Sequence, residues 1–205
     1  LSLMRSNFEF HNLISKKYTK VDVLVNNVGA IFMNKSTTDE GLDKTFALNH
    51  MSYFVLSNLF AESFESLKII NVSSEAHRGI TLRMNDLQNS QGYYGWHAYK
   101  RSKLANIYFT YEMNRKFIDK NLIVNCLHPG LVNSDFANNN SLPFKVMSSL
   151  IKYFGISTKE GASTSIYLAS EPDLANISGL YFDKCVPRKS SAISYNEEVG
   201  KSLWT

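Results

Sequence analysis

The chain has 205 residues, of which 44% are hydrophobic and 20% are charged. This composition excludes a disordered tail, a collagen-like repeat and a disulfide scaffold. A single domain of this length can bury a sizeable core without disulfide bonds or a structural metal. Its 22 basic and 18 acidic residues give a net charge of +4 and form no block of like charge, so we expect no nucleic-acid partner.

Helix-like and strand-like patterns alternate through the first half of the chain. Apolar residues at helical spacing predict a helix over residues 7–18, and a β-branched run predicts a strand over residues 21–25. An apolar-rich stretch over residues 39–59 is followed by a second strand over residues 67–72, and residues 75–95 are expected to be mostly loop. The apolar residues of the first helix are Phe10, Leu13, Ile14 and Tyr18.

The alternation continues through the second half. Residues 96–119 are predicted to form a long helix that leads into a third strand over residues 122–127. Residues 133–157 include a short apolar segment and are interpreted as a substrate lid. A helix over residues 158–170 and a last strand over residues 179–182 follow. The buried stripe expected on the long helix is Leu104, Ile107, Tyr108 and Tyr111.

This order of elements predicts an α/β fold with a doubly wound parallel sheet. Strands separated by helices of a dozen or more residues need crossover connections, which place helices on both faces of the sheet. In such sheets ligands bind beyond the carboxyl ends of the strands. Three successive strands are followed there by polar and turn residues, at Asn26–Gly29, Ser73–Ser74 and Pro129–Gly130. Each run alone is ordinary turn chemistry, but together they indicate a ligand site.

Tyr99 and Lys103 are four residues apart on the long predicted helix. That spacing places both side chains on one face, about one turn apart. A neighbouring cation favours the ionised form of a phenol, so the pair is suited to proton transfer near neutral pH. The alternative is that Tyr99 packs on the sheet while Lys103 is solvated.

These residues, in this order, resemble the short-chain dehydrogenase/reductase family. The resemblance covers nearly the whole chain and rests on five motifs, which are Asn26–Gly29, Leu48–His50, Asn71–Ser74, Tyr99–Lys103 and His128–Gly130. Leu48–His50 and the run from Ser74 to His77 make it closest to the retinol dehydrogenase-like branch. The resemblance implies a Rossmann-like fold and an oxidoreductase that uses NAD or NADP, with NADP favoured.

The resemblance implies four catalytic residues. Tyr99 would be the general acid and base, and Lys103 would lower the phenol pKa and hold the nicotinamide ribose hydroxyls. Ser74 would orient the substrate carbonyl, with Ser73 as the second choice. Asn49 would hold a proton-relay water against the lysine, the alternative being a helix surface residue.

The resemblance also implies cofactor-binding residues in two places besides Tyr99 and Lys103. Asn26 and Gly29 would lie along the adenine-side ribose, where a side chain at the glycine would obstruct close approach of the backbone. The residues after the third strand would wrap the nicotinamide, and these are Pro129, Gly130, Val132 and Ser134. No metal is implied, and His128, directly before the proline, is assigned a structural role.

The expected substrate is a small apolar carbonyl compound or alcohol, retinal-like or another lipophilic aldehyde or ketone. Apolar residues in the presumed lid, including Phe136, Leu142 and Phe144, favour this class. The family resemblance also leads us to expect a homodimer. The alternatives are an inactive or truncated member that only binds a partner, and a nucleotide-binding module of another doubly wound family, which gives no reason for the spacing of Tyr99 and Lys103.

Three features depart from the family pattern. Val28 replaces the usual alanine, and Met51–Phe54 stands where the closest branch tends to have a Gly-His pair. The glycine-rich turn and the first two strands of the family are absent, which would remove the main phosphate cradle and expose a sheet edge. We therefore interpret the chain as a fragment, incomplete at its N-terminus and its C-terminus, and expect it to be neither stable nor active alone.

Cysteine content and hydropathy indicate a location. Cys126 and Cys185 lie in apolar, strand-like runs and are expected to be free thiols, which is typical of a reducing compartment. No run of apolar residues is long enough to span a bilayer, and no signal peptide is visible. A cytoplasmic location is expected for this segment, with an anchor helix in this branch lying before the first strand.

Overall fold

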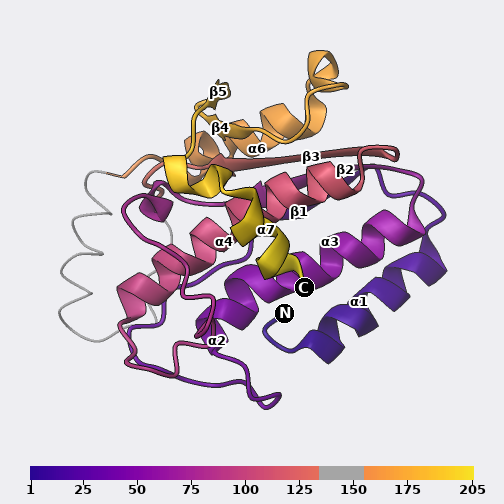
Figure 1. Ribbon diagram of the computed structural model, residues 1–205. Helices are drawn as coiled ribbons and strands as arrows, with labels where there is room; N and C mark the ends of the chain where they lie inside the picture. Colours follow the sequence, from indigo (N-terminus) through magenta and orange to yellow (C-terminus); the bar gives the residue numbers. More distant parts are fainter. Residues whose placement is uncertain (134–154) are drawn as a thin grey trace.

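The computed structural model describes residues 1–133 and 155–205, and its helices and strands alternate along the chain (Figure 1). The longer elements are α1 (Met4–Lys17), β1 (Val23–Asn26), α3 (Ser52–Ser63), β2 (Ser66–Val72), α4 (Gly95–Lys116), β3 (Asn121–His128), α6 (Thr158–Ser170), β4 (Tyr181–Asp183), β5 (Val186–Arg188) and α7 (Glu197–Trp204). The shorter elements include α2 (Lys44–Phe46), the π-helical turn η1 (Ala47–Met51), and the 3₁₀ turns η2 (Glu75–His77), η4 (Pro172–Leu174) and η5 (Ala192–Tyr195).

The strands form one sheet in the order β1-β2-β3-β4-β5. The first four are parallel, which confirms the predicted α/β fold, and only β5 runs antiparallel to its neighbour. Sequence analysis missed β5 because it forms a hairpin with β4 over a tight turn. That turn contains Lys184 and Cys185, both with positive φ, so the prediction that Cys185 lies in a strand is wrong. Cys126 is buried in β3, as predicted.

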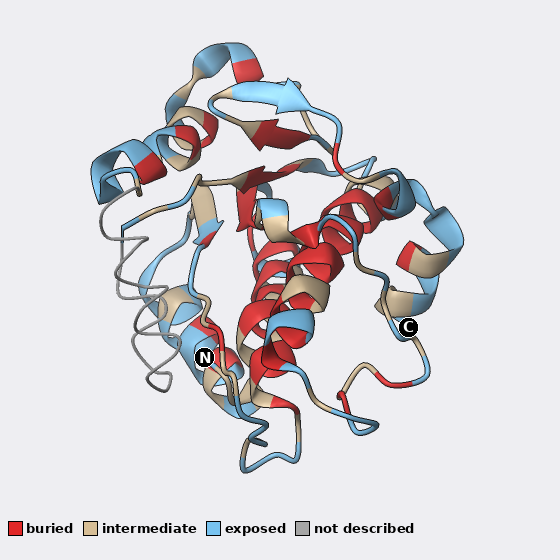
Figure 2. Cartoon of the chain, turned by 90° about the vertical axis from the view of Figure 1, so that its left-hand side faces the viewer, coloured by how far each residue is buried: buried red, intermediate tan, exposed pale blue. Residues whose placement is uncertain are grey.

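Helices cover both faces of the sheet, as the crossover connections require (Figure 1). On one face, α3 and α4 pack on β2 and β3 around a cluster that includes Phe60, Ile69 and Phe109. On the other face, α6 packs over a second cluster that includes Val72 and Leu168. Buried residues gather at the centre of the molecule and exposed ones on the outer helices (Figure 2).

Helix α4 runs through the middle of this arrangement. It was predicted over residues 96–119, and all four residues of its expected stripe are buried. The apolar-rich stretch noted over residues 39–59 is helical from Lys44 and contains the π-helical turn before α3. Near the C-terminus, α7 packs along α4 and places Trp204 against Phe54 and Phe109.

Helix α1 forms where it was expected but packs through a different face. Leu13 is 68% exposed, and Phe10 is 42% exposed, although both belong to the predicted apolar face. The buried residues are instead Asn7 and His11. The His11 ring hydrogen-bonds Ser63 of α3 over 2.8 Å, and periodicity of apolar residues cannot reveal a contact of this kind.

Strand β1 lies at one edge of the sheet. Within the described ranges it pairs only with β2, and Val25 is 42% exposed. The exposed edge predicted from the sequence is therefore present. No helix in the described part of the chain combines the length and apolarity needed to cross a membrane.

Candidate active site

Three strand ends meet at the carboxyl edge of the sheet. β1 leads into Asn27–Gly29, β2 into Ser73–Ser74, and β3 into Pro129–Gly130. Because β1, β2 and β3 are parallel neighbours, these turns lie side by side. The first half of α4 passes this edge and supplies Tyr99 and Lys103, both buried.

Tyr99 and Ser74 interact. The Ser74 hydroxyl favours the ionised form of the Tyr99 phenol, and it accepts a 3.1 Å bond from the backbone N–H of Ala76 at the start of η2. Burial raises the pKa of Tyr99 to about 12, and the Ser74 hydroxyl opposes this rise. The phenol therefore carries its proton at neutral pH and can donate it.

Lys103 lies one helical turn beyond Tyr99, as the spacing predicted. Its ammonium is 5.9 Å from the centre of the Tyr99 ring and donates a 2.9 Å hydrogen bond to the Val72 carbonyl at the end of β2. Burial lowers the pKa of Lys103 to about 7, so the amine changes charge near neutral pH. Lys103 was expected to lower the pKa of the phenol. The pKa of Tyr99 is raised instead, because burial is the largest influence on the pKa of both groups.

Asn49 is fully buried in the π-helical turn η1, which excludes the interpretation as a helix surface residue. Its side-chain oxygen accepts from the Ala30 N–H at 2.9 Å, and its side-chain nitrogen donates to the Ala30 carbonyl at 2.8 Å. The same nitrogen also donates to the Ser102 hydroxyl at 3.0 Å. Asn49 thus holds the loop after β1 against α4.

Gly29 lies where this loop approaches the lysine most closely. A Cβ atom at Gly29 would stand 3.1 Å from the Lys103 nitrogen and 3.3 Å from the Asn49 side-chain oxygen. Such contacts are tighter than most real Cβ contacts, so a larger residue would displace one of the two polar side chains. Glycine therefore leaves room for Lys103 and Asn49 to pack against this loop, a reason that the sequence did not reveal.

The two serines after β2 have different partners. The Ser73 hydroxyl is buried and donates a 2.8 Å bond to the backbone carbonyl of Lys103, so it joins the strand to α4. Ser74 interacts with the Tyr99 phenol instead. This geometry favours Ser74 over Ser73 as the serine that would orient the substrate carbonyl.

The Asn26 side chain is turned into the protein. Its amide nitrogen donates to the Ser57 hydroxyl and to the Asn71 side-chain oxygen, each at 2.8 Å. The amide nitrogen is therefore engaged between β1, α3 and β2.

The residues after β3 are only partly described. Gly130 has a φ of +90°, and Val132 forms a bridge with Ile156. Ser134 and the part of the presumed lid over residues 134–154 lie outside the described residues. His128 accepts a 3.2 Å bond from the Glu75 N–H through Nδ1, which fits its predicted structural role.

Sequence analysis missed residues that support the site from within the core. Asn106, three residues after Lys103, accepts a 3.0 Å hydrogen bond from His50 Nδ1 through its side-chain oxygen and donates to the Asn49 carbonyl at 2.9 Å. His77 closes η2 with a 2.6 Å bond to the Ser74 carbonyl. A polar residue on an otherwise apolar helix face was the available signal for Asn106.

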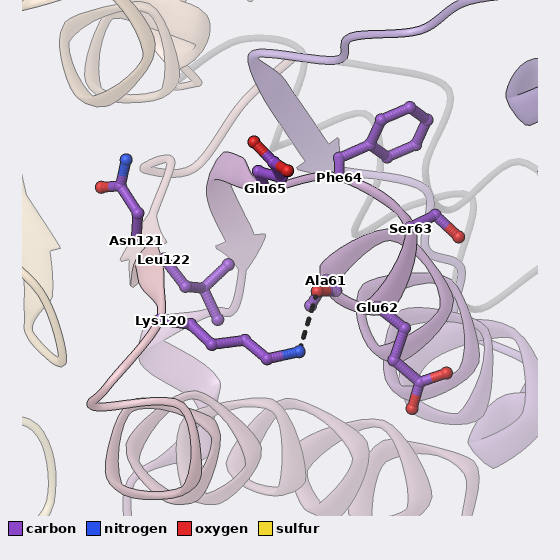
Figure 3. A pocket seen from close by; sticks show the side chains of 8 residues that line it. All are labelled: Ala61, Glu62, Ser63, Phe64, Glu65, Lys120, Asn121 and Leu122. Carbon is purple, nitrogen blue, oxygen red and sulfur yellow. Dashed lines mark hydrogen bonds between the residues drawn. The ribbon is translucent and has the colours of Figure 1, made fainter.

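A pocket among the described residues lies at the opposite, amino edge of the sheet (Figure 3). It has a volume of about 280 Å³ and is lined by residues 61–65 and 120–122. The seven-residue strand β2 separates it from Ser74 by roughly 20 Å. The Lys120 ammonium donates a 3.4 Å hydrogen bond across the pocket to the Ala61 carbonyl. The pocket therefore lies apart from the candidate site residues.

Comparison with known proteins identifies relatives over the whole chain. A family described as short chain dehydrogenase matches residues 4–143. Retinol dehydrogenase 14 of Mus musculus is 34% identical over 210 residues, covering all of this chain. The chain spans 63% of the length of that relative.

Solved structures share the fold. A putative uncharacterized protein from Mycobacterium Paratuberculosis aligns with a TM-score of 0.76 and 24% identity, over 99% of this chain and 70% of the other. The angucycline C-6 ketoreductase LanV, solved with bound NADP, aligns with a TM-score of 0.65 and 22% identity, over 90% of this chain and 71% of the other.

Proposed function

The chain belongs to the short-chain dehydrogenase family, in its retinol dehydrogenase-like branch, and from this premise we propose that it carries the proton-transfer residues of an oxidoreductase acting on alcohols and carbonyl compounds. The observation that carries the proposal is the placement of the buried Tyr99 and Lys103, one turn apart on α4, at the strand end that carries Ser74. The reaction moves a hydride between a nicotinamide cofactor and the substrate carbon.

Tyr99 acts as the general acid in carbonyl reduction and as the general base in alcohol oxidation. Its high pKa keeps the proton on the phenol until a substrate oxygen gains negative charge and can take it. Ser74 donates a hydrogen bond to that oxygen and shares the developing charge. In oxidation the same proton returns to Tyr99.

Lys103 supports this transfer from inside the protein. Val72 is its one hydrogen-bond acceptor among the residues described, so two of its three N–H bonds are available for other acceptors. The hydroxyls of a nicotinamide ribose are acceptors of the right kind, and we propose that Lys103 holds them. Asn49 fixes the neighbouring loop and completes the path by which a water molecule returns the proton.

The remaining cofactor and substrate assignments rest on family membership. Gly29, Pro129, Gly130 and Val132 lie on the loops that border Lys103 or follow β3, and we assign them, with Ser134 and Asn26, to cofactor contacts. NADP is favoured over NAD. The relative named as a retinol dehydrogenase supports an apolar alcohol or aldehyde as the substrate class.

Replacing Tyr99 tests the proposal. In the full-length protein, Tyr99→Phe removes the proton donor and should lower kcat with a lipophilic aldehyde and NADPH by at least about 100-fold, with little change in cofactor affinity. Tyr167→Phe, on α6 across the sheet, is the matched control. Equal rates for Tyr99→Phe and the wild type would reject the assigned role, and a wild type without turnover would favour an inactive, partner-binding member.

A further inference from the structure

His77 connects the turn that carries Ser74 to the C-terminal part of the chain. The ring is completely buried at the end of η2. Its Nδ1 donates a 2.6 Å hydrogen bond to the Ser74 carbonyl, and its Nε2 accepts a 3.0 Å bond from the Ser191 N–H. Because one partner is an acceptor and the other a donor, the ring is neutral and its hydrogen lies on Nδ1.

The segment at the far side of this ring is itself fixed to α4. We define residues 189–195 as the C-terminal segment. The Tyr108 hydroxyl donates to the Ile193 carbonyl at 2.6 Å, and the Tyr111 hydroxyl is hydrogen-bonded to the Ser190 hydroxyl at 2.7 Å. Tyr195 stacks on Tyr111 with ring centres 5.3 Å apart. The Ser191 amide is thus a firm point of attachment for His77.

Two further contacts tie the residues after Ser74 to the same part of the fold. Arg78 donates a 2.8 Å bond to the Lys189 carbonyl. The Tyr181 hydroxyl on β4 donates to the Glu75 carboxylate at 2.9 Å. The turn from Ser74 to Arg78 is therefore held from its outer side, while Ser74 interacts with Tyr99 on its inner side.

The charged groups around the ring act in opposite directions on its pKa, and burial favours the neutral form. Glu75 and Arg78 flank it on the same turn and are paired with each other, His128 approaches from β3, and the Tyr181 ring stands edge-on at 5.2 Å. Burial lowers the pKa of His77. A second proton would sit on Nε2 and point at the Ser191 N–H, which would break that hydrogen bond.

We propose that His77 is a positioning residue for the reaction: it holds the Ser74 carbonyl to the C-terminal segment and so keeps the Ser74 hydroxyl in place to act with Tyr99. This inference rests on the proposed function, because it assigns His77 a part in orienting the proton-transfer pair. The alternative is a buried histidine that contributes only to stability.

A double-mutant cycle separates these two roles. In the full-length protein, His77→Phe keeps a ring of similar shape but loses both hydrogen bonds, and it should lower kcat about tenfold with KM changed less than about threefold. In the background of Ser74→Ala, the same change should lower kcat by less than about twofold, since there is no hydroxyl left to position. Equal losses in both backgrounds would overturn the inference.

Rescue and control variants complete the test. His77→Asn offers an N–H to the Ser74 carbonyl and should recover most of the lost rate, whereas His11→Phe removes a second buried histidine, on α1, and should leave kcat unchanged. If the wild type turns over and Ser74→Ala impairs it while His77→Phe does not, only the inference fails. If the wild type shows no turnover, the proposed function fails first.

A spectroscopic measurement remains decisive if His77→Phe does not fold. In the ¹⁵N imidazole spectrum of the wild-type protein, His77 should appear neutral with its hydrogen on Nδ1. A ring protonated on Nε2, or a charged ring at neutral pH, would contradict the two hydrogen bonds and overturn the inference.

Discussion

The two edges of the sheet differ in what they bury. At the carboxyl edge, Asn26, Asn49, Ser73 and Lys103 are all at most 4% exposed, and each makes a hydrogen bond of 3.0 Å or less to a neighbouring element. At the amino edge, a pocket is lined by the ends of α3, β2 and β3, and the Lys120 ammonium spans it with a longer hydrogen bond of 3.4 Å (Figure 3).

This difference favours the carboxyl edge as the proposed reactive site. Burying a polar side chain is costly unless its hydrogen bonds are made, so a satisfied cluster is retained where its chemistry is used. The amino-edge pocket needs no such explanation, because its polar side chains reach solvent.

Replacing the two serines after β2 gives the largest expected contrast. Ser74→Ala should lower kcat about 100-fold, because it removes a hydrogen-bond donor to the substrate oxygen. Ser73→Ala removes a buried bond to the Lys103 backbone and should cost about 1 kcal/mol of unfolding free energy with a much smaller loss of kcat. Parallel steady-state kinetics and urea unfolding of the two variants measure this. The reverse order of rate losses would assign the role to Ser73.

A smaller effect is expected in the pH dependence of stability. Burial lowers the pKa of Lys103 in the folded protein to about 7, below its ordinary value of 10.5. Between these two values the unfolded chain binds a proton that the native amine does not, so this group makes stability rise with pH over that range.

In the Lys103→Met variant, this increase of folding stability with pH should be absent. Urea unfolding midpoints between about pH 7 and pH 10, compared for the wild type and the variant, would show a steeper increase in the wild type. Lys120→Met controls for the removal of a lysine at the other edge. Identical slopes for the wild type and Lys103→Met would mean that the Lys103 amine is not desolvated in solution.

The smallest effects are expected at the amino edge. Glu65→Gln and Lys120→Ala change side chains that line the pocket but touch no residue of the cluster around Tyr99. Each should alter unfolding free energy by no more than about 0.5 kcal/mol and leave kcat and KM unchanged. A clear loss of turnover in either variant would show that the comparison between the two edges is mistaken.

The sequence predicts the parts of this molecule that depend on local pattern. The parallel strands, α4 and the pairing of Tyr99 with Lys103 follow from periodicity and spacing, because both report which face of an element is buried. The π-helical turn around Asn49 and the hairpin of β4 and β5 are not predicted, since neither has a periodic signal. The buried face of α1 is set by His11 and Ser63, 52 residues apart.

The supporting contacts of the site are also set by long-range packing. His77 belongs to a motif that is visible in the sequence, but its partner Ser191 is 114 residues away. The choice of Ser74 over Ser73 could be argued from the family resemblance. The different partners of the two serines could not, because they depend on where α4 lies in the fold. The sequence therefore indicates the proposed reacting residues but not the long-range hydrogen bonds that fix their positions.

Hydrogen exchange with and without cofactor tests the central claim most directly. The full-length protein would be compared alone and with saturating NADPH, and separately with NADH. We expect slower amide exchange in the turns at residues 27–32, 73–78 and 129–133, and unchanged exchange at residues 61–65 and 120–122. Slowing confined to the amino-edge segments, or no slowing with either nucleotide, would contradict the assignment of the carboxyl edge as the active site.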